Sequence, residues 1–248
     1  MTEEVPLLVE QHGAVRWLII DRPGKRNAMT SAMGARLGEL LDDAAADAGT
    51  RVIVITGNGG SFSSGLDRDE IAGGMANKSE FPVEAFVQFA KPTIACIEGS
   101  AFGGGATMAM ACDLRVASSD ATLTFGLGRV GLTPEWGSSY LLWRQIGWSR
   151  ALDLFFTART VDTEEAMRIG LVDRVVEPGG DARAATQTLA EQIASLPAGT
   201  AEAIKDVLRR GLDVDFLGAR DAEMATLAGR VGALRAARRA KAERDATS

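Results

Sequence analysis

Short apolar runs rich in β-branched residues recur along the first 180 residues of this chain and alternate with stretches of helical spacing. The runs end at Gly, Pro or Asp, which is typical of buried strands that enter turns. Strands that alternate with helices in this way predict an α/β core. The expected strands are residues 15–23, 51–60, 91–99, 113–118 and 171–180, and the expected helices are 30–48, 82–90, 104–112, 135–147, 149–157 and 163–169.

The end of the chain differs from its beginning, because the apolar spacing over residues 181–248 is helical throughout. We therefore predict an α/β core over 1–180 and a helical C-terminal region over 181–248, whose partly apolar helices are suited to oligomer contacts. A chain of 248 residues can bury a sizeable core without disulfides or metals. Cys96 and Cys112 lie in apolar surroundings and are expected to be buried thiols.

Charge and hydropathy restrict the partners. The net charge of −6 argues against nucleic acid as the main partner, because a phosphate backbone demands a basic surface. The run RAARRAKAER (235–244) is locally basic, and it suits either a solvated helix end or a contact with a phosphorylated small molecule. No charged-then-apolar leader opens the chain and no apolar run reaches about 18 residues, so we expect a cytoplasmic protein without a membrane span.

Three successive glycines, Gly103 to Gly105, stand between an expected strand and an expected helix. Each glycine inside a helix costs about 1 kcal/mol relative to alanine, so the series needs a physical reason. The first N–H groups of a helix have no partner within it and lie at the positive end of the helix dipole. Glycines there would let an anionic ligand approach the backbone. A tight turn packed against a neighbouring segment is the alternative explanation.

A second glycine-bearing turn, GNGGSFSSGLDRDE (57–70), also follows an expected strand, with Asp67 as the expected cap of the next helix. Such a turn can likewise present a free N–H group. Two N–H groups from two strand-to-helix turns can meet at one oxygen, which is the arrangement of an oxyanion hole.

Five segments together resemble the enoyl-CoA hydratase/isomerase (crotonase) superfamily in order and spacing over roughly residues 5–180. The resemblance implies an α/β fold of the ClpP/crotonase type, with a superhelical core of ββα turns and a C-terminal helical trimerisation region. It also implies homotrimers, or hexamers made of two trimers. The segments are DRPGKRNAM (21–29), GSFSSGLD (60–67), KPTIACIEGSAFGGGATMAMACDLRVAS (91–118), GLTPEWGSSYLL (131–142) and TARTVDTEEAMRIGLVDRVV (157–176).

By this resemblance the partner is an acyl-CoA thioester, whose carbonyl oxygen accepts hydrogen bonds from the N–H groups of Leu66 and Gly104. No metal or redox cofactor is implied, and CoA arrives as part of the substrate. Lys25 and Arg26 suit contacts to the CoA phosphates or adenine, although solvated loop charges have the same pattern. The residues expected to bind substrate are Lys25, Arg26, Ala28, Ser64, Gly65, Asp67, Gly103, Thr107, Leu127, Pro134 and Trp136.

Two positions depart from the pattern of the family's hydratases, which use a pair of glutamates. The first position is Thr107 and the second is Leu127. Adding water to a double bond requires a group that activates the water and a group that manages the proton. A threonine hydroxyl is a poor base at neutral pH and leucine is none, so Thr107 is expected to be a pocket wall or to position water.

A different carboxylate, Glu135, follows in GLTPEWGSS. In Δ3,Δ2-enoyl-CoA isomerases of the peroxisomal type, an acid at this position is the catalytic base. One carboxylate can take a proton from C2 and return it to C4 while the oxyanion hole holds the dienolate. The alternative is local: Thr133 would cap a helix, Pro134 would open it, and an acid would favour its dipole. A helix N-terminus lowers the pKa of Glu135, whereas an apolar pocket raises it.

The sequence therefore favours enoyl-CoA double-bond isomerisation with Glu135 as the base. A hydratase with displaced catalytic groups and an inactive acyl-CoA-binding protein are the alternatives. GLGRVG (126–131) matches a dinucleotide fingerprint, but its helix is expected to begin only after the motif. The single histidine, His12, is expected in a surface turn and offers no catalytic triad. Aromatic residues around one expected helix predict core packing or a helix interface: Trp136, Tyr140, Trp143 and Trp148.

Overall fold

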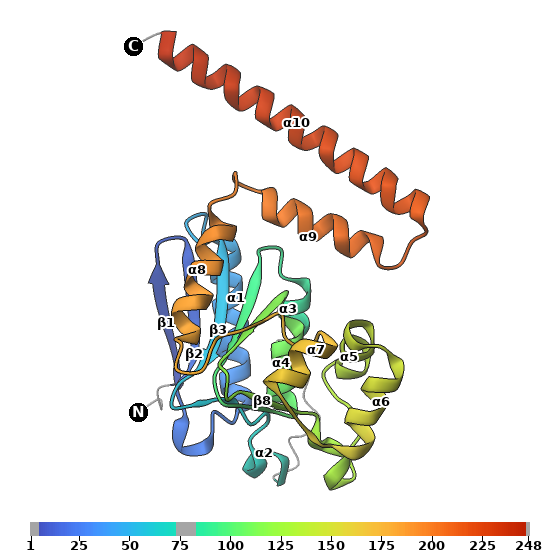
Figure 1. The fold of residues 1–248 in the computed structure, drawn as a ribbon. Coiled ribbons are helices and arrows are strands. Elements are labelled where there is room, and N and C mark those ends of the chain that lie inside the picture. The colour runs from blue at the N-terminus through green and yellow to red at the C-terminus, as the bar shows by residue number, and fades with distance from the viewer. Residues whose placement is uncertain (1–4, 73–82, 247–248) are drawn as a thin grey trace. The chain divides into compact units, whose positions relative to one another are not determined.

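Two β-sheets form the centre of the first of two units (Figure 1). The computed structural model describes residues 5–72 and 83–246, and the units divide after Ser195. The larger sheet has the order β1-β2-β3-β5-β7-β10, and the smaller one β4-β6-β8-β9. Their strands are β1 (Leu7–His12), β2 (Val15–Ile20), β3 (Val52–Gly57), β4 (Ser61–Ser63), β5 (Thr93–Ile97), β6 (Ser100–Phe102), β7 (Leu114–Ala117), β8 (Thr122–Thr124), β9 (Thr160–Asp162) and β10 (Arg174–Val175).

From β3 to β8, consecutive strands alternate between the two sheets. β3, β5 and β7 are parallel neighbours in the larger sheet, and the strand that follows each of them joins the smaller sheet, where β4, β6 and β8 are again parallel. Helices α2 (Arg68–Ala72) and α3 (Val83–Gln88) follow the first pair, and α4 (Gly104–Ala111) follows the second. The core is thus a succession of ββα turns, and each turn brings its strand-to-helix connection to the same end of the unit.

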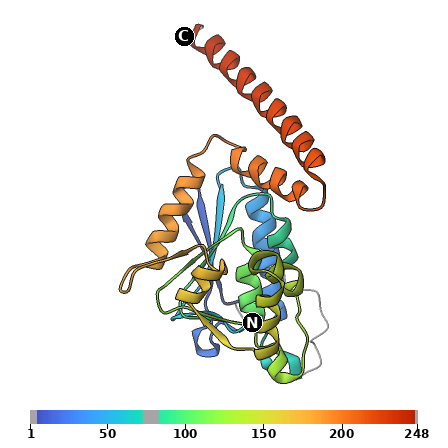
Figure 2. The ribbon, with the colours of Figure 1, turned by 45° about the vertical axis from the view of Figure 1, so that its right-hand side comes forward.

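Both faces of the larger sheet are buried. Leu18 and Ile53 point into a core that includes residues of α1 (Ser31–Ala46) and α4. Their strand neighbours Trp17 and Val52 point into a second core under α8 (Ala182–Ala194), on the opposite face (Figure 2). Because α8 packs on this sheet, the first unit runs to Ser195 and the expected boundary at 180 is too early.

The burial of the two cysteines in these cores determines the state of their thiols. Cys96 and Cys112 are free and buried, as expected. Burial raises the pKa of the Cys96 thiol to about 11, so this side chain is a neutral apolar group at physiological pH.

The expected elements differ from the structure mainly at their ends, but β1 and the strands of the smaller sheet were missed. The chain around His12 forms the end of β1 rather than only a turn. Helix α5 (Ser138–Ile146) begins three residues later than expected, after the 3₁₀ helix η2 (Gly126–Val130). α6 (Trp148–Thr157) and α7 (Thr163–Ile169) lie within a residue of their expected bounds. A short 3₁₀ helix, η1 (Pro23–Lys25), lies in the loop between β2 and α1.

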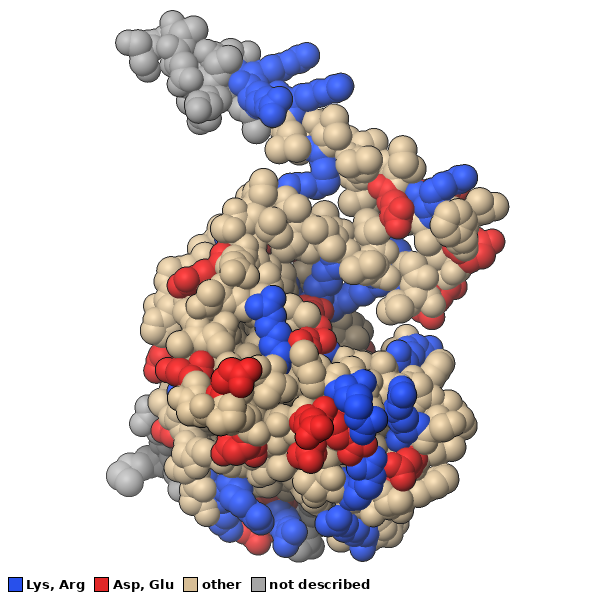
Figure 3. Space-filling model, viewed as in Figure 1, with Lys and Arg blue, Asp and Glu red and all other residues tan. Residues whose placement is uncertain are grey.

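The second unit consists of helices α9 (Thr200–Gly211) and α10 (Phe216–Ala246), which pack on each other. Arg230 donates a hydrogen bond of 2.7 Å to the Thr200 hydroxyl between them. Basic side chains gather on the later turns of α10 (Figure 3), where Arg235, Arg238 and Arg239 are exposed. The rest of the expected basic run, 240–244, has side chains outside the described residues. Within the described parts, no helix is both long and apolar enough to cross a membrane.

Candidate active site

The glycine series at the start of α4 has three separate structural causes. Gly103 has a φ of 54°, a conformation that side chains disfavour. A Cβ atom on Gly104 would lie 2.0 Å from the ring of Trp136, and one on Gly105 would lie 2.2 Å from the carbonyl oxygen of Ser63. The close approaches that require glycine here are thus made by the protein itself. Tight packing, which the sequence offered as the alternative, accounts for Gly104 and Gly105.

The two strand-to-helix turns nevertheless meet as expected. Gly65 has a φ of 83°, and a Cβ atom on it would lie 2.8 Å from the amide nitrogen of Gly104. Leu66 follows Gly65 and pairs with Met29, whose N–H donates to the Gly65 oxygen and whose oxygen accepts from Asp67 N. Among the main-chain hydrogen bonds of the described residues, neither the Leu66 N–H nor the Gly104 N–H is a donor. Both amides are therefore available to an external oxygen.

Glu135 lies on an irregular segment between η2 and α5. The helix begins at Ser138 with Gly137 as its N-cap, so the interpretation of Thr133 as the cap and Pro134 as the first helical residue is wrong. Glu135 is half-buried, and this burial raises the pKa of its carboxyl group above the ordinary 4.5. Burial is the cause of this shift, and Glu135 lies before the N-cap of α5 rather than in its first turn.

Trp136 joins this acidic segment to the glycine turn. Its ring sits against the Cα of Gly104, in the space that a side chain there would fill. Its backbone has a φ of 52°, an uncommon conformation for a bulky residue, which tertiary contacts must hold. Through this contact the segment that contains Glu135 packs against the glycine turn.

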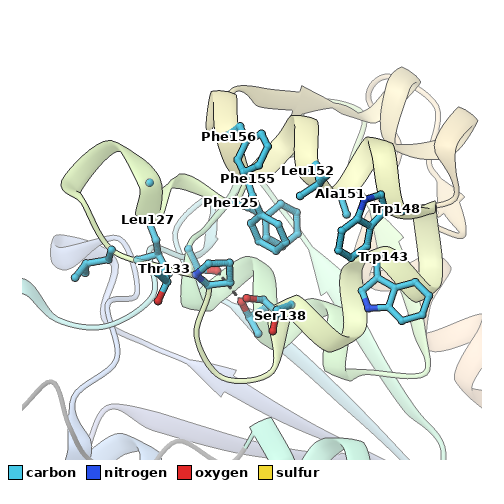
Figure 4. Close-up of a pocket in the computed structure, with 16 residues that line it drawn as sticks. Phe125, Leu127, Thr133, Ser138, Trp143, Trp148, Ala151, Leu152, Phe155 and Phe156 are labelled. Atoms are coloured by element: carbon cyan, nitrogen blue, oxygen red, sulfur yellow. Dashed lines mark hydrogen bonds between the residues drawn. The ribbon is translucent and has the colours of Figure 1, made fainter.

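A cavity of about 470 Å³ lies beside the glycine turn (Figure 4). Gly103, Thr107, Leu127 and Pro134 line it, so four of the expected substrate-binding residues come together. The Thr107 hydroxyl is buried and donates 3.2 Å to the Gly103 oxygen. The cavity lining also includes residues that the sequence did not indicate: Phe125, Gly128, Leu132, Thr133, Ser138, Ser139, Ala151, Leu152, Phe155 and Phe156.

The aromatic residues of α5 and its surroundings are not core residues. Tyr140 is 42% exposed, Trp143 38% and Trp148 64%, so these side chains are not buried in the core, and the edge-to-face contact between Trp143 and Trp148 fits the alternative of a helix interface. Trp143 and Trp148 line the cavity instead. The sequence placed these residues around one expected helix, whereas Trp143 lies on α5 and Trp148 begins α6.

Asp67 is held by contacts within the protein. Its carboxylate is 3% exposed and forms an ion pair with Arg22, and it accepts from Asp69 N at 2.8 Å, which confirms it as a helix cap. Burial tends to raise the pKa of Asp67, but the hydrogen bonds from Arg22 and Asp69 outweigh it and hold that pKa below 3.8. The expected contact of Asp67 with substrate stays a prediction.

The loop that precedes α1 runs beside this turn. Ser64 N donates to the oxygen of Arg26 at 2.9 Å, and Arg22 donates to the oxygen of Ala28 at 3.2 Å. Lys25 forms an exposed ion pair of 3.0 Å with Asp69, as the solvated alternative for this residue allows. Asn27, which the sequence did not single out, is fully buried, and its side-chain amide donates to the oxygens of Asn58 and Ser61. The Asn27–Ala28 pair, which follows Pro23 in the loop, forms no sequence pattern that would indicate this role.

Metal-binding geometry is not found, because the described residues contain no group of three His, Cys, Asp or Glu side chains placed to hold an ion. The groups on these segments include two main-chain amides, an apolar cavity and, on the neighbouring segment, the half-buried Glu135 carboxylate with its raised pKa.

Comparison with known proteins agrees with this geometry. The family model described as Enoyl-CoA hydratase/isomerase matches residues 10–231. The short-chain-enoyl-CoA hydratase of Clostridium acetobutylicum is 34% identical over 85% of this chain and 83% of its own length. The 4-chlorobenzoyl coenzyme A dehalogenase-2 of an Arthrobacter species is 32% identical over 82% of this chain and 77% of its own.

Solved structures give the same result for the fold. A crystal structure from Thermobifida fusca YX in complex with acetoacetyl-CoA has a TM-score of 0.82 and 29% identity, over 92% of this chain and 95% of that one. The expected crotonase-type fold is thereby confirmed.

Proposed function

Because the chain belongs to the enoyl-CoA hydratase/isomerase family, we propose that it moves the double bond of a 3-enoyl-CoA thioester to the 2-position. The relatives' names include a hydratase and a dehalogenase, so family membership alone does not fix the reaction. The acids of this chain must decide it.

The thioester carbonyl would be held by the N–H groups of Leu66 and Gly104. Both lack a main-chain acceptor within the described residues, and their two turns are in contact. When a proton leaves C2, negative charge accumulates on this oxygen, and two fixed N–H dipoles stabilise it. Loss of one such donor typically costs about 2.7–4 kcal/mol of barrier.

Glu135 would carry the proton. Its ionised carboxylate takes the proton from C2, the electrons move through the dienolate, and the carboxylic acid returns the proton to C4. A raised pKa suits this exchange, because it makes the carboxylate a stronger base than a solvated one. The reaction moves only a proton, so it needs no metal or redox cofactor, and CoA enters as part of the substrate.

Hydration is the less favoured reaction. Thr107 and Leu127, which occupy the positions of the hydratase glutamates, both line the cavity, where they offer a hydroxyl and an alkyl group. Neither side chain is a base at neutral pH. The observation that carries the proposal is the contact of Trp136 with Gly104, since it joins the Glu135 segment to the turn that would hold the carbonyl.

The test is to incubate the purified protein separately with 3-enoyl-CoA and 2-enoyl-CoA and to identify the products by chromatography. We expect 2-enoyl-CoA from the first substrate, and we expect Glu135→Gln to lower this rate about 10²–10⁴-fold while binding of the CoA ester is retained. Glu164→Gln, at an exposed acid of α7, is the matched control and should keep full activity. A 3-hydroxyacyl product from 2-enoyl-CoA would identify a hydratase. Tight binding without turnover would identify an inactive binder, and either result would overturn the proposal.

A further inference from the structure

The cavity beside the proposed thioester site is walled by aromatic rings. Five aromatic side chains, from β8's exit, α5 and α6, line its apolar part (Figure 4), namely Phe125, Trp143, Trp148, Phe155 and Phe156. Its volume of about 470 Å³ falls within the range of roughly 300–1,000 Å³ that is usual for small-molecule sites. Its polar groups are few, and they include the hydroxyls of Thr107 and Ser138.

The rings are held in defined pairs. Phe125 and Phe155 meet edge to face, with centroids 5.8 Å apart and planes at 77°. Trp143 and Trp148 also meet edge to face, with centroids 6.5 Å apart and planes at 72°. The Arg144 guanidinium lies 4.5 Å from the centroid of the Trp143 ring, which adds a cation–π contact to that pair. Rings that brace one another in this way form a wall of fixed shape.

The cavity adjoins the segments of the proposed site, although Glu135, Gly104 and Leu66 are not among its lining residues. Gly103 and Pro134 line it, and the next residues along the chain are Gly104, with its unpaired amide, and Glu135. An acyl group whose carbonyl lies at Gly104 therefore extends naturally into the aromatic part of the cavity.

We propose that the acyl group this protein takes bears an aromatic ring, which enters the space between the Phe125–Phe155 pair and the Trp143–Trp148 pair. This inference rests on the proposed acyl-CoA site and names its substrate class. A ring gains edge-to-face contacts with the wall that a linear alkyl chain of equal carbon number does not gain. Because the lining offers few hydroxyls, a polar acyl group would find few hydrogen-bond partners there.

The first test is calorimetric binding of phenylacetyl-CoA and octanoyl-CoA, which have the same number of acyl carbons and the same CoA moiety. We expect phenylacetyl-CoA to bind about three- to tenfold more tightly. Phe155→Leu, which keeps an apolar side chain and removes the ring, should abolish that preference. Tyr140→Leu is the matched control, because Tyr140 lies on the same helix as Trp143 but is not a lining residue, and it should keep the preference.

Equal or tighter binding of octanoyl-CoA would overturn the inference, and so would a preference that survives in Phe155→Leu. If thermal melting shows that Phe155→Leu does not fold, Trp148→Leu replaces it, since Trp148 is 64% exposed and its loss should leave the fold intact. Loss of the preference in Trp148→Leu would then support the inference, and its survival would overturn it.

A second measurement separates this inference from the proposed reaction. The kcat/KM for 4-phenylbut-3-enoyl-CoA is compared with that for 3-decenoyl-CoA, again at equal carbon number, and we expect the aromatic substrate to be preferred several-fold. A protein that prefers phenylacetyl-CoA in binding but isomerises neither substrate would keep the substrate class and overturn the reaction. A protein that isomerises 3-decenoyl-CoA faster would keep the reaction and overturn the substrate class.

Discussion

Glu135 is a half-buried acid whose pKa lies above 4.5 because of its burial. In the proposed reaction it must be ionised to accept the C2 proton, and it becomes protonated as the pH falls through its raised pKa. We therefore expect kcat/KM to decline on the acid side with a midpoint above 4.5, measured from the initial rate on 3-enoyl-CoA across the acid range. A midpoint at or below 4.5 would show that a better solvated group, and not Glu135, controls the rate.

Gly104 lies under the ring of Trp136. In Gly104→Ala the new Cβ would lie 2.0 Å from that ring, so Trp136 must move and the Glu135 segment with it. We expect a loss of about 1–3 kcal/mol in the free energy of unfolding, from urea titration, together with a large loss of isomerase activity. Gly38→Ala, in α1 with open space around it, is the control and should be neutral or slightly stabilising.

A double variant tests the cause of that loss. Trp136→Ala combined with Gly104→Ala removes the colliding ring, so the two changes together should destabilise less than the sum of the separate changes. Strictly additive free energies would argue against the ring contact as the reason for glycine at position 104.

At the scale of single residues, the sequence indicated the candidate positions but not the contacts that hold them. The glycines, Glu135 and the missing hydratase acids could be found because each is a residue type at a fixed spacing. The ring of Trp136 on Gly104 could not, because that contact joins segments far apart in the chain. The same holds for Asn27, whose buried amide binds oxygens more than thirty residues away.

Among the elements, the loop before α1 and the turn before α2 are held together by Arg22 and Asp67. The pKa of Asp67 lies below 3.8, so the ion pair contributes stability above that pH and loses it as the pH falls toward the folded-state pKa. We expect Asp67→Asn to lower the free energy of unfolding by about 2–3 kcal/mol at neutral pH, and by less in acid, measured by urea titration at several pH values.

The matched control is Asp69→Asn, two residues further on. Asp69 pairs with Lys25 at the surface with 82% of its side chain exposed, so solvent screens the interaction and the change should be small. An equal effect of the two substitutions would mean that burial of the Arg22 pair contributes nothing.

Strands β2, β3, β5 and β7 of the larger sheet could be predicted because their β-branched runs are buried, whereas the exposed edge strand β1 was missed. Strands β4, β6 and β8 have three residues each, too few to display an alternation, and they were missed. The repeated ββα turn is accordingly a repeat of structure without a repeat of sequence. The start of α5 was placed too early because Thr133, Pro134 and Glu135 resemble a helix opening, whereas Gly137 makes the cap.

For the whole molecule, the second unit exposes apolar side chains that a lone chain would leave in water, including Leu208 at 68% and Phe216 at 80%. Such surfaces mark protein contacts. We expect self-association, with a mass by light scattering of about three times the 26.1 kDa of one chain, or twice that trimer mass. Leu208→Glu should lower the mass, whereas Glu223→Lys, at an exposed polar position of α10, should not. A monomer at all concentrations would contradict this prediction.

The groups proposed to bind the carbonyl and the proposed base differ in how mutation affects them. Leu66 and Gly104 would act through main-chain N–H groups, which most codon changes leave in place, whereas positions 107, 127 and 135 act through side chains that one codon can replace. On the proposed chemistry, a descendant of this chain can exchange one reaction for another by a few point mutations on the cavity side, without rebuilding the part of the backbone that grips the thioester. In such a scaffold the acid can therefore be replaced with little effect on the backbone, whereas replacement of the glycines would disturb it.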